Sequence, residues 1–83
     1  MRHRFLGNFE RQYADAPPAV QRAFDKQLRL LLEQGFRYRS LDAHPWPADG
    51  PDAWQARVND AWRFYYFMDG DTYVIYGLKK HRD

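Results

Sequence analysis

Arginine supplies most of the positive charge in this sequence, and two arginines occupy positions that neighbouring strands of a sheet would bring onto one face. Ten of the 13 basic residues are Arg, and Arg57 and Arg63 fall in neighbouring alternating segments, 54–58 and 62–68. Guanidinium groups hold phosphate oxygens through paired hydrogen bonds. His81, close to the C-terminus, is a side chain that transfers protons near neutral pH. These residue types predict an anion site beside a proton donor, unless His81 is merely an exposed terminal histidine.

The register of the two segments decides whether the arginines meet. A three-residue turn over 59–61 pairs Ala56 with Phe64 and keeps the apolar side chains on one face. The same register sets Arg57 directly opposite Arg63, whereas a two-residue turn would mix apolar and polar faces. Two opposed arginines repel each other. Either a nearby Asp or an anion held by both guanidinium groups must offset that repulsion, and both alternatives stay open.

The last segment, 72–78, brings further candidates to the arginine face. A three-residue turn around Gly70 places Gly77 opposite Arg63 and carries Lys79 and His81 onto the same side. Tyr65 and Tyr73 would share this face, and cations interleaved with rings suit a single-stranded nucleic acid. A two-residue turn would reverse the faces of this last strand.

The elements that must position these residues form an α+β fold. We expect a strand over 2–6, a helix from Asn8 to Asp15, a helix from Pro18 to Gly35, and three strands over 54–58, 62–68 and 72–78. The order is β-α-α-β-β-β, with a helical hairpin packed on one face of a small antiparallel meander. Residues 36–53 are loop-rich, and Trp46 either covers the sheet or contacts a partner. Residues 1–83 make one domain.

Composition narrows the class of protein. The chain has 83 residues, 18% of them aromatic, and zero cysteines. No apolar run approaches the ~20 residues of a membrane span, so we expect a cytoplasmic protein with no membrane contact. Residues 1–39 carry eight basic against four acidic residues, whereas 42–71 carry two against six.

His3 and His44 lack the spacing of metal ligands, and no cofactor motif is present, so we expect neither a metal nor a cofactor.

An ordered set of segments across the whole chain resembles the RelE/ParE-superfamily toxins of bacterial toxin–antitoxin systems. The resemblance implies the strand–helix–helix–three-strand fold and a cognate antitoxin wrapped around the toxin. The segments are Phe9…Tyr13, Pro17-Pro18…Val20…Leu28…Leu31-Leu32 and Ser40-Leu41; Trp54-Gln55-Ala56-Arg57-Val58 and Trp62-Arg63-Phe64-Tyr65-Tyr66; then Gly70-Asp71-Thr72-Tyr73-Val74-Ile75 and Lys80-His81-Arg82-Asp83.

The resemblance also implies roles for single residues. Many such toxins are ribosome-dependent endoribonucleases that cut mRNA in the decoding site without metal. Arg63 matches the arginine that stabilises the scissile phosphate, and His81 matches the tail histidine that acts as general acid. Arg57 matches a recurrent cation on the neighbouring strand, and Lys79 and Lys80 match the basic tail.

The sequence departs from the family pattern at the expected base. Arg39 stands where some nuclease members have a catalytic Glu, and Asp42 and His44 lie where others have lysines. No general base is assigned, with His44 as a candidate. The leading hypothesis is therefore an mRNA endoribonuclease in which Tyr65 or Tyr73 stacks a base. The alternatives are a ParE-like inhibitor of DNA gyrase and a degenerate member that only binds its antitoxin.

Overall fold

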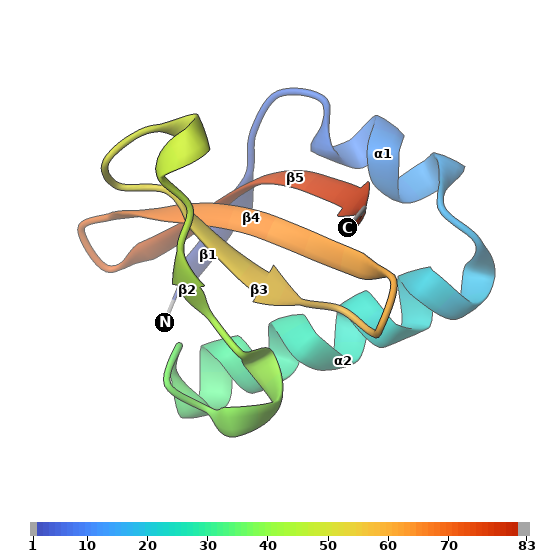
Figure 1. The fold of residues 1–83 in the computed structure, drawn as a ribbon, viewed down its shortest axis with the longest axis horizontal. Helices are drawn as coiled ribbons and strands as arrows, with labels where there is room; N and C mark the ends of the chain where they lie inside the picture. The colour runs from blue at the N-terminus through green and yellow to red at the C-terminus, as the bar shows by residue number, and fades with distance from the viewer. Residues whose placement is uncertain (1, 82–83) are drawn as a thin grey trace.

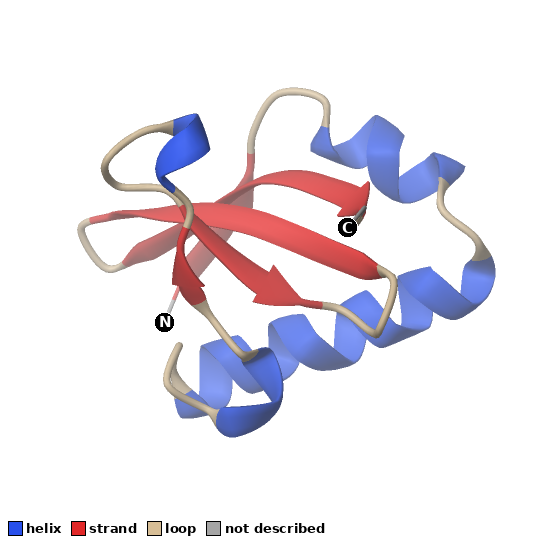
Figure 2. Ribbon diagram, viewed as in Figure 1, coloured by secondary structure: helices blue, strands red, loops and turns tan. Residues whose placement is uncertain are grey.

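The computed structural model describes residues 2–81, which form two helices packed on a five-stranded sheet (Figure 2). The predicted α+β class is confirmed. The strand order is β1-β5-β4-β3-β2, and Figure 1 shows the N-terminal strand lying beside the last one. The elements are β1 Arg2–Phe5, α1 Phe9–Asp15, α2 Pro18–Gln34, the 3-10 turn η1 Arg39–Leu41, β2 His44–Pro45, the 3-10 turn η2 Pro47–Asp49, β3 Trp54–Arg57, β4 Trp62–Asp69 and β5 Thr72–Lys80.

Both helices follow the apolar periodicity of the sequence. Phe9 on α1 and Phe24 and Leu31 on α2 are buried against the sheet. Gly35 ends α2 with a φ of 85°, a conformation that glycine adopts without a steric penalty. Asn8 precedes α1 as predicted, but its side chain makes no capping hydrogen bond. Helix α2 runs along one side of the sheet in Figure 1.

The β3–β4 hairpin has the predicted three-residue turn and register. Ala56 lies opposite Phe64 and Arg57 lies opposite Arg63. The Asn59 carboxamide oxygen accepts the backbone N–H groups of the two residues that follow it, at 3.0 and 2.9 Å. Because the Asn59 side chain accepts hydrogen bonds from two backbone N–H groups of the turn, a three-residue turn is stable here.

The β4–β5 hairpin differs from the prediction in two ways. Its turn has two residues, with Asp69 paired to Thr72, and Gly70 takes a φ of 62° at the first turn position. Glycine at that position favours a two-residue hairpin. Further along, Tyr66 pairs with Ile75 but Tyr65 pairs with Gly77, so Tyr76 is the extra residue of a β-bulge.

These two differences decide on which face of the sheet each side chain of β5 lies. Before the bulge, Tyr73 is moved to the helix side, which contradicts its predicted place on the arginine face. After the bulge the predicted parity returns, so Lys79 does face the same side as Arg63 and lies directly opposite it. Gly77 lies opposite Tyr65 rather than opposite Arg63.

The sheet is mixed rather than wholly antiparallel. Strand β1 pairs in parallel with β5, because the helical hairpin carries the chain across one face between them. Strand β2, within the segment expected to be loop, pairs antiparallel with β3 and adds an outer edge.

No helix within residues 2–81 is long and apolar enough to span a bilayer. The largest fully buried side chains are Phe9, Phe24, Leu31, Leu41, Phe64, Tyr66, Val74 and Ile75.

Candidate functional site

Arg57 and Arg63 lie on the sheet face turned away from the helices, at the end that carries the β3–β4 turn. Arg57 forms an ion pair with Asp60, whose side chain is 95% exposed. The Nη1 of Arg63 donates to the carbonyl oxygens of Asn59 and Trp62, at 2.6 and 2.9 Å. Turn carbonyls and one Asp therefore offset the repulsion between the two guanidinium groups, without excluding an anion between them.

Lys79 and His81 belong to the same end of the sheet. Lys79 is exposed opposite Arg63, and its Nζ lies 5.6 Å from the centre of the Tyr65 ring. The backbone N–H of His81 donates to the carbonyl of Ala61 in the β3–β4 turn. Arg57, Arg63 and Lys79 thus lie together on three adjacent strands, and the backbone of His81 lies beside the β3–β4 turn at the same end. Arg82 and Asp83 lie outside the described residues.

Lys80 and Tyr73, two further predicted site residues, do not lie on the arginine face. Lys80 pairs with Trp62 and so shares the helix side rather than the arginine face. Tyr73 is only 3% exposed, packs in the helix-side core, and receives a backbone hydrogen bond from Phe36. Burial raises the pKa of the Tyr73 hydroxyl. Its ring cannot stack on a base at the arginine face.

Tyr65 does lie on the predicted face, but other side chains cover it. It is 5% exposed beneath Trp46, with ring centres 5.7 Å apart, and its hydroxyl accepts a hydrogen bond from Gln55 at 3.1 Å. Of the two readings of Trp46, the cover is the one observed. The half-buried Trp46 ring therefore covers Tyr65 on this face of the sheet.

A buried glutamine, which sequence reasoning missed, ties the loop before β2 to this site. Gln27 lies within the apolar stripe of α2 and is 6% exposed. Its Nε2 donates to the carbonyls of Ser40 and Arg57, at 2.9 and 2.8 Å. The polar position in an otherwise apolar stripe is the sequence signal that could have revealed it.

His44 is brought to the arginine face by β2. It pairs with Gln55, whose side chain points to the Tyr65 side of the sheet. The His44 Nδ1 lies 3.0 Å from the carbonyl oxygen of Asp42. Within residues 2–81, no group of three or more His, Cys, Asp or Glu side chains is arranged to hold a metal ion.

The sequence itself matches no protein-family model and no curated protein sequence. Solved structures, however, match almost the whole chain. The YoeB/ParE toxin from Agrobacterium tumefaciens aligns with a TM-score of 0.81 at 15% identity over 99% of this chain and 100% of that one. YafQ from E. coli strain BL21(DE3) aligns with a TM-score of 0.79 at 14% identity, covering 98% and 94%.

A third match is an archaeal toxin solved with its partner. The RelE–RelB complex from Pyrococcus horikoshii OT3 aligns with a TM-score of 0.75 at 19% identity, covering 95% of this chain and 92% of the other. The fold is that of the RelE and YoeB toxins. Identity this low establishes the RelE-like fold, and the chemistry has to be argued from the residues.

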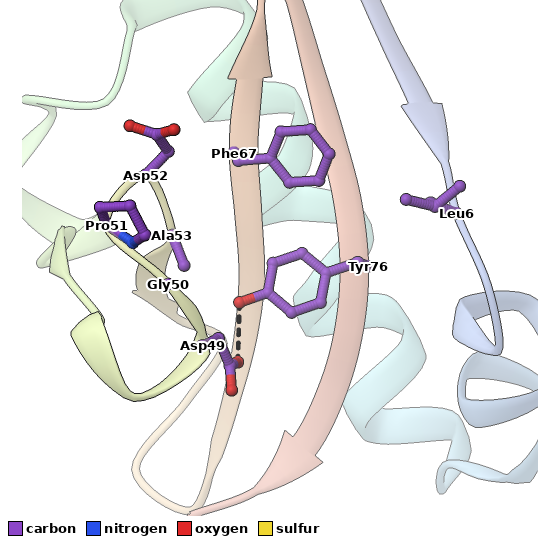
Figure 3. Close-up of a pocket in the computed structure, with 8 residues that line it drawn as sticks. All are labelled: Leu6, Asp49, Gly50, Pro51, Asp52, Ala53, Phe67 and Tyr76. Carbon is purple, nitrogen blue, oxygen red and sulfur yellow. Dashed lines mark hydrogen bonds between the residues drawn. The ribbon is translucent and has the colours of Figure 1, made fainter.

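The RelE-like fold of this chain also carries a pocket at the other end of the arginine face (Figure 3). The pocket has a volume of about 390 Å³. Figure 3 shows the rings of Phe67 and Tyr76 within it, with the Tyr76 hydroxyl donating to Asp49 at 2.7 Å. Burial and this carboxylate raise the pKa of Tyr76. With Asp49 and Asp52 in its wall, this pocket is unsuited to a phosphate. Its lining residues are Leu6, Asp49, Gly50, Pro51, Asp52, Ala53, Phe67 and Tyr76.

Proposed function

We propose that this protein is the toxin of a toxin–antitoxin pair and that it cleaves mRNA bound to the ribosome in the cytoplasm. The observation that carries the proposal is the convergence of Arg57, Arg63 and Lys79 from three adjacent strands beside His81. Similar folds in solved toxins support the toxin role. Three cations on one exposed face suit a polyanion.

The proposed reaction is transesterification by the RNA's own 2′-hydroxyl, which needs a base, an acid and cations around the phosphate. Arg57 and Arg63 stabilise the negative charge that develops on the phosphate oxygens. Arg57 exchanges an exposed Asp60 partner for the phosphate, and such exposed pairs are worth only about 0–1 kcal/mol. His81 donates a proton to the departing 5′-oxygen.

The test is mRNA cleavage on translating ribosomes, comparing the wild type with Arg63→Ala and His81→Gln. Losing one group that stabilises the transition state lowers the rate about 100-fold or more, so both variants should be nearly inactive. Arg22→Ala, on the exposed side of α2, is the matched control and should cleave like the wild type. Equal cleavage by all proteins, or none by any, contradicts the nuclease proposal.

The proposed partner is a cognate antitoxin with an acidic, partly disordered segment that folds across the arginine face. Solved relatives of this fold include a RelE–RelB complex and a YoeB–YefM complex from Staphylococcus aureus. Co-purification of the tagged chain with the product of the adjacent reading frame tests this partner. The complex should weaken when Arg57 and Arg63 are both replaced by Gln.

One observation favours a second candidate function, a protein-binding inhibitor of DNA gyrase. The Arg63 guanidinium already binds turn carbonyls, so it stabilises the β3–β4 hairpin whether or not a phosphate arrives. A gyrase supercoiling assay with the purified chain separates the two functions. Growth arrest on expression without the neighbouring gene separates either toxin from a degenerate member that only binds its antitoxin.

A further inference from the structure

We propose that the pocket at the far end of the arginine face binds the side chain of an arginine from a partner polypeptide. The proposed reaction does not use this pocket, so the inference goes beyond the proposed function. Three features of the structure carry it: two aromatic rings on the pocket floor, two carboxylates on one wall, and the distance from the pocket to the arginine pair.

The rings of Phe67 and Tyr76 form the floor of the pocket. Phe67 follows Tyr66 and Tyr76 follows Ile75, and because those two preceding residues belong to the helix-side core, both rings lie on the opposite face. The ring centres are 6.1 Å apart, with 39° between the ring planes, and both side chains are half-buried. The volume of about 390 Å³ is at the lower end of the range for ligand pockets, which suits one large side chain.

The wall beside these rings carries the carboxylates of Asp49 and Asp52. Figure 3 shows both residues on one side of the rings and Leu6 on the other. The Tyr76 hydroxyl donates to Oδ2 of Asp49 at 2.7 Å, which holds this carboxylate beside the ring and leaves its Oδ1 able to accept from a ligand. Asp52 is exposed and takes part in no ion pair among the described residues. The pocket lining contains no Lys, Arg or His, so its negative charge is not neutralised locally.

This combination of rings and carboxylates matches a guanidinium group. A guanidinium is a planar cation that stacks on an aromatic face and donates paired hydrogen bonds to a carboxylate. The ammonium group of a lysine is a compact charge without a planar face, and a phosphate would meet two like charges. A metal ion is also unsupported, since within residues 2–81 no three His, Cys, Asp or Glu side chains are grouped to hold one.

The distance to the arginine pair specifies the partner further. Phe67 lies four residues after Arg63 on β4, which is about 13 Å along an extended strand. Side chains four residues apart on an extended peptide also share one side and span this distance. A segment that crosses the face over Trp46 therefore places an acidic residue at Arg57 and Arg63 and an arginine, four residues away, in the pocket. The identity of that segment as part of the antitoxin rests on the proposed function, whereas the binding of arginine does not.

The experiment titrates the isotope-labelled full chain with short peptides and follows its backbone amide signals by NMR. The probe is a five-residue peptide with glutamate first, arginine last, glycine and serine between them, and blocked ends. Its control peptide has citrulline in place of arginine, which keeps the shape and removes the charge. The probe should shift the amide signals of residues 49–53 and of Tyr76. The citrulline peptide should bind about tenfold more weakly, because it loses the cation–π contact and the charged hydrogen bonds.

Two variants locate the bound arginine. Asp49→Asn/Asp52→Asn removes the charge of the wall, while an amide oxygen at position 49 can still accept the Tyr76 proton, so thermal unfolding should stay close to that of wild type. This variant should bind the arginine and citrulline peptides with the same weak affinity. The matched control, Asp15→Asn/Glu33→Gln, removes two exposed charges from the helices and should bind both peptides as wild type does.

The outcomes separate this inference from the proposed function. Equal binding of the arginine and citrulline peptides to wild type overturns the inference, and so does a shift of the pocket signals by a short single-stranded RNA. A peptide with glutamate and arginine adjacent cannot reach both ends of the face and should bind more weakly than the probe; equal binding overturns the four-residue spacing. If the probe binds at the pocket but the protein cleaves no ribosome-bound mRNA, only the nuclease proposal falls.

Discussion

Arg57 and Arg63 are a pair of like charges that neighbouring groups of the β3–β4 turn stabilise. Asp60 and the carbonyls of the β3–β4 turn hold the two guanidinium groups without burying them under the helices. Exposed ion pairs contribute little stability, so exchanging Asp60 for a phosphate is inexpensive. In the proposed function a phosphate takes the place of Asp60, while the turn carbonyls keep the Arg63 guanidinium in position.

A different residue offers a prediction about stability. The Tyr66 hydroxyl is the one buried side-chain polar atom with no hydrogen-bond partner among the described residues, and burial raises its pKa. Tyr66→Phe should leave the free energy of unfolding unchanged or raise it by about 1 kcal/mol, because an unsatisfied buried group is removed. The matched change Tyr76→Phe removes the hydrogen bond to Asp49 and should lower the free energy of unfolding by about 1 kcal/mol. Urea denaturation measures both.

The same tyrosine gives the sign of the alkaline response. With a pKa raised in the folded state, the unfolded chain loses its phenolic proton first, so stability falls as pH rises above the ordinary tyrosine pKa of about 10. Denaturation of Tyr66→Phe should show a smaller alkaline loss than wild type. A Tyr66→Phe protein clearly less stable than wild type at neutral pH would show that the hydroxyl has a partner after all.

At the scale of elements, each helix uses a glutamine to satisfy backbone groups at the end of the sheet. The Gln12 side chain on α1 accepts the N–H of Leu78, at 2.9 Å, on β5 beyond the stretch that β1 pairs with. Gln27 on α2 donates to the carbonyl of Arg57 at the end of β3 and to the carbonyl of Ser40 in η1. The helices thus fix the sheet ends that carry the candidate site, besides burying its apolar face.

We therefore expect Gln27→Leu to be costly although leucine suits a helix and a core. The partly buried carbonyls of Ser40 and Arg57 would both lose their donor, which predicts a loss of about 1 to 3 kcal/mol in the free energy of unfolding. Gln34→Leu, at the exposed end of the same helix, should change it by less than about 0.5 kcal/mol. Equal effects of the two substitutions in urea denaturation would show that the clamp contributes nothing.

At the scale of the whole molecule, the face opposite the helices is electrically divided. Arg57, Arg63 and Lys79 lie at one end, while Asp49 and Asp52 border the pocket at the other. The net charge of +2 hides this separation. A single-stranded RNA should thus be held at one end only, with its affinity set by few phosphates.

Salt dependence tests that picture. For single strands, the logarithm of the binding constant falls with the logarithm of salt concentration by about 0.7 per neutralised phosphate, so three cations predict a slope of about −2. Arg57→Gln should reduce the slope by about 0.7, whereas Lys26→Gln on exposed α2 should leave it unchanged. Fluorescence anisotropy with a short labelled RNA measures the slope, and a reduction by Lys26→Gln would place the RNA on the helix side.

Sequence alone was sufficient for the helices and for the pairing of the two arginines. Residues 54–58 and 62–66 alternate cleanly between apolar and polar or mixed side chains, so a register slip would bury an arginine. Pro18 and Gly35 bound the long helix for reasons that act within a single turn of chain. Both inferences depend on local sterics and on a period of two or 3.6 residues.

Tertiary structure decided the rest. Residues 73–78 are apolar or aromatic on both faces, so their alternation does not indicate the two-residue turn or the bulge at Tyr76. The sequence pattern alone therefore predicts the wrong side of the sheet for Tyr73. The β2 pairing that delivers His44 joins a prolyl dipeptide, which has no strand preference, to a partner about ten residues away. The pairing of β2 with β3 depends on contacts between segments far apart in the sequence, such as the hydrogen bonds from Gln27 to Ser40 and Arg57. No single segment contains the residues that determine it.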